Sequence, residues 1–154
     1  MLSTSVPSFT LTPAVSADFD ALVDIRIEAM RESLERIGRF DPVRARERFR
    51  IGFAVEYTRH IVLGDERIGF VVVKPQTDAL LLDHLYIKPA YQGHGIGAAV
   101  LQIVFAEACS QSLAIRVGAL RESASNRFYL RYGFQLIECG EFDNYYERPA
   151  EIAL

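Results

Sequence analysis

A glycine-rich tract between an apolar run and an amphipathic segment has the residue spacing best suited to chemistry. Its sequence is Leu85-Tyr86-Ile87-Lys88-Pro89-Ala90-Tyr91-Gln92-Gly93-His94-Gly95-Ile96-Gly97. Glycines at three alternate positions remove the β-carbons that would block a ligand. A helix that begins directly after such a turn presents unpaired N–H groups and the positive end of its dipole to an anion. The tract therefore predicts a phosphate-binding turn between a strand and a helix.

The same tract formally matches the dinucleotide fingerprint G-x-G-x-x-G/A over residues 93–98. In dinucleotide-binding folds that fingerprint follows the first strand of the domain, and an acidic residue about 20 positions later holds a ribose hydroxyl. Here the match lies past the middle of the chain, and the next apolar run, Leu113–Ala119, contains no carboxylate. These differences disfavour a dinucleotide. A tight turn without any ligand is the other alternative.

Two motifs at compatible spacing connect the tract with a known family. Counted from Gln92, the tract reads Q-x-x-G-x-G, and Phe128–Phe134 reads F-Y-x-x-x-G-F. With the preceding Leu-Tyr-Ile-x-Pro, these motifs resemble the acetyl-CoA loop and the last-helix motif of the GNAT superfamily of N-acetyltransferases. The resemblance covers essentially residues 9–148. It implies acetyl-CoA (coenzyme A) as a co-substrate. The few cysteines and histidines, two and three in number, separately lead us to expect no metal.

The resemblance assigns the cofactor contacts mainly to backbone groups. Loop N–H groups would bind the pyrophosphate of coenzyme A, and the backbone of the strand end would pair with the pantetheine arm like a neighbouring strand. A backbone N–H near Leu85 or Tyr86 would stabilise the developing oxyanion. The residues expected to bind the cofactor are Leu85, Tyr86, Ile87, Gln92, Gly93, His94, Gly95, Ile96, Gly97, Asn126 and Tyr129.

Acyl transfer to a primary amine requires two proton movements, because the acceptor ammonium must lose a proton before attack and the departing thiolate must gain one. By the resemblance, Tyr129 is the general acid. Asp83 and His84 are the candidate bases, on opposite faces of one strand because side chains alternate, and water without a dedicated base is the third alternative. The implied function is an N-acetyltransferase that acts by direct attack in a ternary complex. A non-catalytic coenzyme A-binding module is the alternative.

The acceptor side is less defined. In the family the first two helices and their connection, here about Arg31–Phe53, wall off the acceptor, with Glu141–Tyr146 opposite. The acceptor would be the amine of a small molecule or of a protein. Many relatives have Asn six residues before the first Phe of F-Y-x-x-x-G-F, where this chain has Glu122. Asn126, one helical turn later, is therefore the residue expected to contact the cofactor.

The elements that position these residues follow from apolar periodicity and turn residues. The predicted strands are Phe9–Val15, Tyr57–Leu63, Ile68–Val73, Ala79–Ile87, Leu113–Ala119, Phe134–Cys139 and Tyr145–Arg148, with Gly64–Arg67 as a hairpin turn. A first helix is capped by Ser16, buries a stripe and ends at Gly38; the stripe is Val23, Ile27, Met30, Leu34 and Ile37. Further helices are predicted over Val43–Phe53, after Asp41-Pro42, and over Ile96–Ser110 and Ser123–Tyr132.

A strand, a helical crossover and a further strand place Ala79–Ile87 and Leu113–Ala119 in parallel. The remaining strands follow one another by hairpins. We therefore predict a single α/β (α+β) domain over residues 1–154 with a GNAT-like fold. Its sheet is mixed and mostly antiparallel, with about seven strands, a central β-α-β crossover and helices on both faces.

Composition disfavours several function classes. The 17 basic and 20 acidic residues give a formal net charge of −3, so we expect no nucleic-acid and no membrane surface. The first 17 residues contain no Lys or Arg and no long apolar run, so we expect no signal peptide and a cytoplasmic location. Cys109 and Cys139 have no metal-binding spacing and are expected to be reduced thiols. The oligomeric state stays open, and a homodimer is compatible with the sequence.

Overall fold

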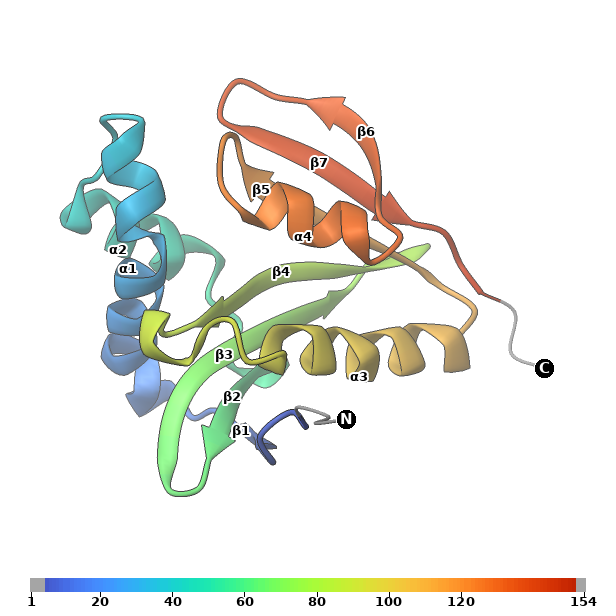
Figure 1. Ribbon diagram of the computed structural model, residues 1–154, viewed down its shortest axis with the longest axis horizontal. Coiled ribbons are helices and arrows are strands. Elements are labelled where there is room, and N and C mark those ends of the chain that lie inside the picture. Colours follow the sequence, from blue (N-terminus) through green and yellow to red (C-terminus); the bar gives the residue numbers. More distant parts are fainter. Residues whose placement is uncertain (1–4, 152–154) are drawn as a thin grey trace. The chain divides into compact units, whose positions relative to one another are not determined.

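The structure is a computed structural model that describes residues 5–151. Within these residues seven strands form one sheet, in the order β1-β2-β3-β4-β5-β7-β6 (Figure 1). The strands are β1 (Thr10–Pro13), β2 (Thr58–Leu63), β3 (Glu66–Pro75), β4 (Ala79–Ile87), β5 (Ala114–Leu120), β6 (Gln135–Cys139) and β7 (Asp143–Arg148). The α-helices are α1 (Phe19–Arg36), α2 (Pro42–Gly52), α3 (Ile96–Ser110) and α4 (Ser125–Arg131), and the short 3-10 helices are η1 (Ser16–Asp18), η2 (Val55–Tyr57) and η3 (Pro89–Tyr91).

The sheet is mixed. The strands joined by α3 are parallel, with Ala79–Leu82 of β4 beside Ala114–Val117 of β5. The pairs β1/β2, β2/β3, β5/β7 and β6/β7 are antiparallel. The predicted mostly antiparallel sheet of about seven strands with a central β-α-β crossover is confirmed.

The chain forms two compact units. One comprises residues 5–72 and 84–99, and the other comprises residues 73–83 and 100–151. The first unit therefore contains α1, α2 and the start of α3, and the second contains α4, β5, β6 and β7. Both β3 and β4 contribute residues to each unit.

The core of the first unit is aromatic. The ring of Phe49 on α2 lies 5.7 Å from Phe19 and 5.6 Å from Phe70 of β3. Leu22 and Ile25 of α1 are buried in the same cluster. Of the predicted stripe on α1, Val23 is buried, whereas Ile27, Met30, Leu34 and Ile37 are only half-buried. The prediction that all five stripe residues are buried was thus partly wrong, because the aromatic rings lie against the first half of α1.

Turn residues follow the prediction with one difference. Gly38 has a φ of +70° and terminates the first helical segment, and Asp41 Oδ1 accepts from Arg44 N–H at 3.1 Å as the N-cap of α2. The hairpin turn is shorter than predicted. Glu66 pairs with Leu63, so only Gly64 and Asp65 remain between β2 and β3.

The predicted cap at Ser16 is wrong, because residues 16–18 form η1, whose N-cap is Val15, and the N-cap of α1 is Asp18. The carboxylate of Asp18 instead accepts hydrogen bonds from Val15 N–H (2.9 Å), His60 Nε2 (2.8 Å) and Arg67 Nη1 (3.0 Å). The bond from the Val15 backbone, followed by those from His60 and Arg67, lowers the pKa of Asp18 to about 2. One carboxylate thus joins the segment after β1 to β2 and β3.

This lowered pKa predicts a pH-dependent contribution to stability. A depressed carboxyl pKa stabilises the fold above the unfolded value near 4, and the contribution is lost as the pH falls toward 2. Asp18→Asn is expected to lower the free energy of unfolding by about 2 kcal/mol at pH 7 and by less at pH 3. Urea unfolding at both pH values measures this difference. Asp20→Asn, at a side chain 76% exposed, is the control and should change little. A deficit of equal size at both pH values would contradict the assignment.

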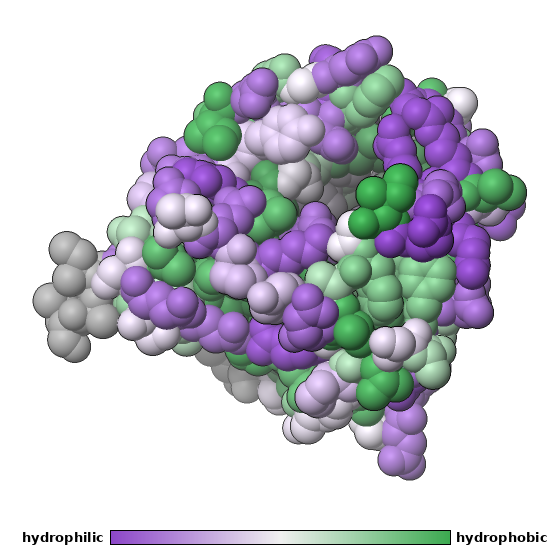
Figure 2. All heavy atoms as spheres, turned by 180° about the vertical axis from the view of Figure 1, so that it is seen from behind, coloured by the Kyte–Doolittle hydropathy of each residue, from purple (hydrophilic) through white to green (hydrophobic). Residues whose placement is uncertain are grey.

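The face drawn in Figure 2 carries both hydrophilic and hydrophobic side chains, and the hydrophobic ones gather most densely toward its lower right. The exposed large apolar side chains include Val43, Ile51, Leu136 and Ile137. No helix within residues 5–151 combines the length and the apolar character needed to cross a bilayer.

Candidate active site

The glycine-rich turn joins β4 to α3 within the first unit (Figure 1). Gly93 and Gly95 have φ values of +81° and +82°, a region that side chains with a β-carbon avoid. A β-carbon on Gly93 would meet no described heavy atom within 4 Å, so the turn is open on that side. The Gly95 carbonyl accepts the first bond of α3, from Ala99 N–H at 3.0 Å. The N–H groups of the first helical turn, from Ile96 on, have no partner within the helix.

Three contacts anchor the turn. Gln92 Nε2 donates to the Ile87 carbonyl at 2.8 Å, and Lys88 N–H donates to the Ile68 carbonyl at 2.8 Å. The Tyr91 hydroxyl donates to the Glu66 carboxylate, and this bond raises the pKa of Tyr91. Glu66 lies 25 positions earlier in the chain, so no local sequence signal could have identified it. The turn is thus held on both sides, and Gly93 and the exposed His94 side chain face solvent. At Gly95 a β-carbon would stand 3.1 Å from Val6 Cγ2, so that side of the turn is covered.

The two candidate bases lie in different surroundings. His84 packs against Phe49 at 5.1 Å and Phe70 at 6.2 Å between ring centroids. Its Nδ1 lies 3.3 Å from the Tyr86 hydroxyl, so these two side chains share a face of β4, as side chains two residues apart in a strand do. Asp83 instead forms an ion pair with Lys74 of β3, at 2.8 Å between Nζ and Oδ2. Sequence reasoning missed Lys74, because a cross-strand partner leaves no local pattern.

Tyr129 is buried within the second unit, at 5% exposure. Its ring lies 5.2 Å from Phe134 in an edge-on arrangement and 6.4 Å from Tyr146. Part of the F-Y-x-x-x-G-F motif stabilises the fold. The Phe134 N–H donates to the Tyr129 carbonyl at 3.1 Å and closes the turn after α4. Gly133 permits this turn with a φ of +91°.

Asn126 is the centre of a hydrogen-bond network. Its Nδ2 donates to the carbonyls of Leu120 and Ser123, both at 2.9 Å. Its Oδ1 accepts from the Tyr146 hydroxyl at 2.7 Å and from Asn144 Nδ2 at 3.0 Å. Burial raises the pKa of Tyr146, which keeps this hydroxyl a donor. The amide nitrogen and the amide oxygen of Asn126 both have hydrogen-bond partners within the protein. The contact between Asn126 and the cofactor stays a prediction.

Glu122 has an exposed side chain and a φ of +71°. Asn adopts this left-handed conformation more readily than Glu does. The departure from the family pattern at this position therefore leaves a strained residue just before α4.

Comparison with known proteins identifies the family. The family model described as "Acetyltransferase (GNAT) domain" matches residues 53–136. The chain belongs to the GNAT acetyltransferase family. The matched region contains both motifs, the glycine-rich turn and the segment around Tyr129. A sequence search of curated proteins found no match.

Solved structures of this GNAT family fold resemble the chain over nearly its whole length. The PaiA N-acetyltransferase from Thermoplasma acidophilum, in complex with coenzyme A, has a TM-score of 0.76 at 18% identity, over 92% of this chain and 99% of that one. An acetyltransferase from Thermus thermophilus has a TM-score of 0.72 at 18% identity, covering 94% and 98%. The ribosomal-protein-S18-alanine N-acetyltransferase from Escherichia coli has a TM-score of 0.71 at 15% identity, covering 95% and 96%. At these identities the likeness concerns the fold.

Proposed function

We propose that this GNAT family member is an N-acetyltransferase that moves an acetyl group from acetyl-CoA to a primary amine, with residues 1–154 acting as one catalytic domain. The observation that carries the proposal is the open glycine turn before α3, where Gly93 and Gly95 have positive φ values. A coenzyme A complex among the similar structures supports the choice of donor. The acceptor is the amine of a small molecule or of a protein.

The turn has the donor set that a pyrophosphate requires. Its positive φ values turn successive N–H groups outward, and the start of α3 adds the positive end of a helix dipole. A side chain at Gly93 would project into the open space that the phosphates would use. We assign the pyrophosphate to the N–H groups of Gly93 through Gly97, because the Gln92 N–H already donates to the Pro89 carbonyl at 3.2 Å. We assign the pantetheine arm to the backbone of Leu85–Ile87.

Two side chains would move the protons. Acetyl-CoA supplies the thioester carbonyl that the amine nitrogen attacks. The Tyr129 hydroxyl would donate a proton to the departing sulfur, and a base would accept the proton that the acceptor ammonium releases. We favour His84 as that base, because a neutral imidazole accepts protons near neutral pH. The Asp83 carboxylate is held by the Lys74 ammonium, and it is the second candidate.

Release of free thiol tests the function. Purified protein with acetyl-CoA and a panel of primary amines should release thiol faster than the protein-free blank, at a rate that rises with pH as the acceptor ammonium loses its proton. In a thermal shift assay, coenzyme A at 100 times its Kd should add about 2.7 kcal/mol of stability. Stabilisation by NAD instead would refute the donor assignment. Stabilisation by coenzyme A with no amine giving thiol above the blank would favour the non-catalytic binding module.

The base assignment predicts unequal effects of two substitutions. His84→Gln is expected to lower kcat/KM about 100-fold at pH 7. Asp83→Asn should cost less than about tenfold, because it removes an ion pair with Lys74 and leaves the proton acceptor in place. Initial rates of both variants and of the wild-type protein, at the same pH and acceptor concentration, measure the two effects. The reverse order of the two effects would assign the base to Asp83.

A further inference from the structure

Arg26 lies on the inner, apolar face of α1. Leu22 and Val23, four and three positions before it, are buried in the core of the first unit. Ala29 and Met30, three and four positions after it, are half-buried. Residues at these spacings are the neighbours of a side chain on a helix surface. None of the four carries a charge, so α1 offers Arg26 no ion-pair partner at these positions.

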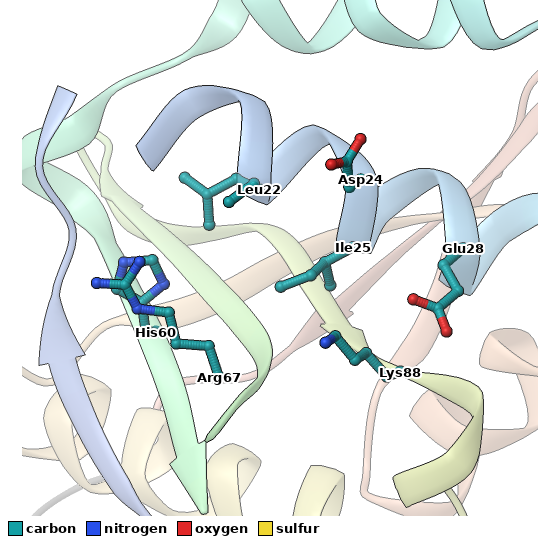
Figure 3. Close-up of a pocket in the computed structure, with 8 residues that line it drawn as sticks. Leu22, Asp24, Ile25, Glu28, His60, Arg67 and Lys88 are labelled. Atoms are coloured by element: carbon teal, nitrogen blue, oxygen red, sulfur yellow. The ribbon is translucent and has the colours of Figure 1, made fainter. Parts of the chain in front are cut away.

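The charge of Arg26 is not neutralised by contacts with other elements either. Its Nη1 donates to the carbonyl of Ala45 in α2 at 2.9 Å, and a carbonyl is neutral. Its Nε is buried without a hydrogen-bond partner, and within residues 5–151 no carboxylate pairs with the guanidinium. In Figure 3 Leu22 and Ile25 point from α1 toward the sheet, whereas Asp24 points away from it. A half-buried cation without an anion is costly, and an anionic ligand group would remove that cost.

The guanidinium contacts α2 close to the candidate base. Ala45 and Phe49 are both buried and stand one helical turn apart on α2, about 5 Å along its axis. The ring of Phe49 lies 5.1 Å from the ring of His84. All of these residues belong to the first unit. A molecule with its amine at His84 and a second polar group several bonds away can therefore extend toward Arg26.

The surroundings on α2 favour an anion as that second group. Residues 39–50 contain five arginines and only two carboxylates, in a chain whose net charge is −3. Arg44 and Arg48 are exposed, stand one turn apart, and have no side-chain partner in the part of the chain that the structure describes. Clustered charges of one sign attract ligands of the opposite sign.

We propose that Arg26 binds a carboxylate of the acceptor, so that the substrates are amines that carry a carboxylate several bonds from the nitrogen. This inference rests on the proposed acetyl transfer. The acceptor carboxylate accepts from Nη2 of Arg26, which has no partner among the described residues. Arg44 and Arg48 draw the carboxylate toward α2, and the amine lies at His84. An amine without an anionic group leaves Arg26 unpaired.

Binding without acetyl-CoA is the first test. Isotope-labelled protein is titrated with 6-aminohexanoate and, separately, with hexylamine, which has a methyl group in place of the carboxylate. Saturable amide shifts are expected around Arg26 and Ala45, and hexylamine should bind about tenfold more weakly or worse. Equal affinities for the two probes would overturn the proposal. Because this comparison uses the wild-type protein and no turnover, its failure is distinguishable from failure of the proposed acetyl transfer.

The ratio of two acceptor rates is the second test. Arg26→Met should lower kcat/KM for 6-aminohexanoate about tenfold and leave kcat/KM for hexylamine within about twofold. Arg26→Lys, which keeps the charge, should restore part of the loss. Arg131→Met removes the same charge from an exposed position on α4 and should leave the ratio unchanged. An equal loss with both acceptors would mean that Arg26 only holds α2 through Ala45, and it would overturn the proposal.

A variant at the surface and a peptide complete the design. Arg48→Gln, at an exposed residue whose change should not affect folding, is expected to weaken binding of 6-aminohexanoate about threefold and that of hexylamine not at all. Unchanged affinity for both would remove α2 from the proposal. A tripeptide with a free amino terminus and a glutamate side chain, compared with its glutamine counterpart, shows whether the carboxylate belongs to a peptide or to a small molecule.

Discussion

Gly69→Ala is expected to lower the free energy of unfolding by about 3 kcal/mol and to disturb the strand that leads into the glycine turn. A β-carbon at this position would overlap the Tyr86 carbonyl oxygen and stand 3.1 Å from the Ile87 Cα. Both are backbone atoms, so no side-chain rotation can relieve the overlap. The end of β4 would have to move away from β3. Urea unfolding and the affinity for coenzyme A measure the two consequences.

A matched glycine in another strand provides the control. At Gly118 of β5 a β-carbon would lie 3.3 Å from the ring of Tyr145, a side chain that can shift. Gly118→Ala should therefore cost less than about 1 kcal/mol. If the two variants unfold at the same urea concentration, the close approach of the β4 backbone to Gly69 does not explain why glycine is needed there.

Tyr129→Phe is expected to lower kcat about 100-fold while the KM for acetyl-CoA changes little, if its hydroxyl protonates the departing sulfur. The ring would keep its packing against Phe134 and Tyr146, so the fold should remain intact. Steady-state rates and thermal unfolding of the same preparations separate the two effects.

Tyr132→Phe is the control for the hydroxyl, because Tyr132 follows α4 directly and its ring packs on Phe128 at 5.2 Å. Its activity should match that of the wild type. A Tyr129 variant with full activity would remove the general acid from the mechanism. A loss that disappears with an acetyl thioester whose thiol has a lower pKa would support it, because a better leaving group needs less protonation.

The elements were predictable because local patterns determine them. A nearly continuous apolar run predicted β4, helical periodicity predicted α3, and Gly38 and Gly133, which have positive φ values, lie just after helix ends. Ser16 failed as a cap because the nearby Asp18 carboxylate is bound by residues more than 40 positions away. Such tertiary partners override local preference.

The candidate site was predictable only in part. The two motifs located the glycine turn and Tyr129, since short spacings are visible in sequence. The residues that contact these site residues could not be identified from the sequence. Lys74 beside Asp83, Glu66 beside Tyr91 and Tyr146 beside Asn126 are contacts between separate elements, and their sequence separation hides them.

The carboxylate of Asp18 also bears on the solubility of the protein in acid. β1 is the edge strand of the sheet and lies beside β2. The Asp18 carboxylate accepts hydrogen bonds from Val15, just after β1, and from His60 of β2, and so it connects these two parts of the chain. Protonation of this carboxyl would weaken the attachment of β1. Release of β1 would uncover the backbone edge of β2, a template for pairing with other chains. We therefore expect acid-induced aggregation to begin at β2, and a charged substitution at Val62 to suppress it.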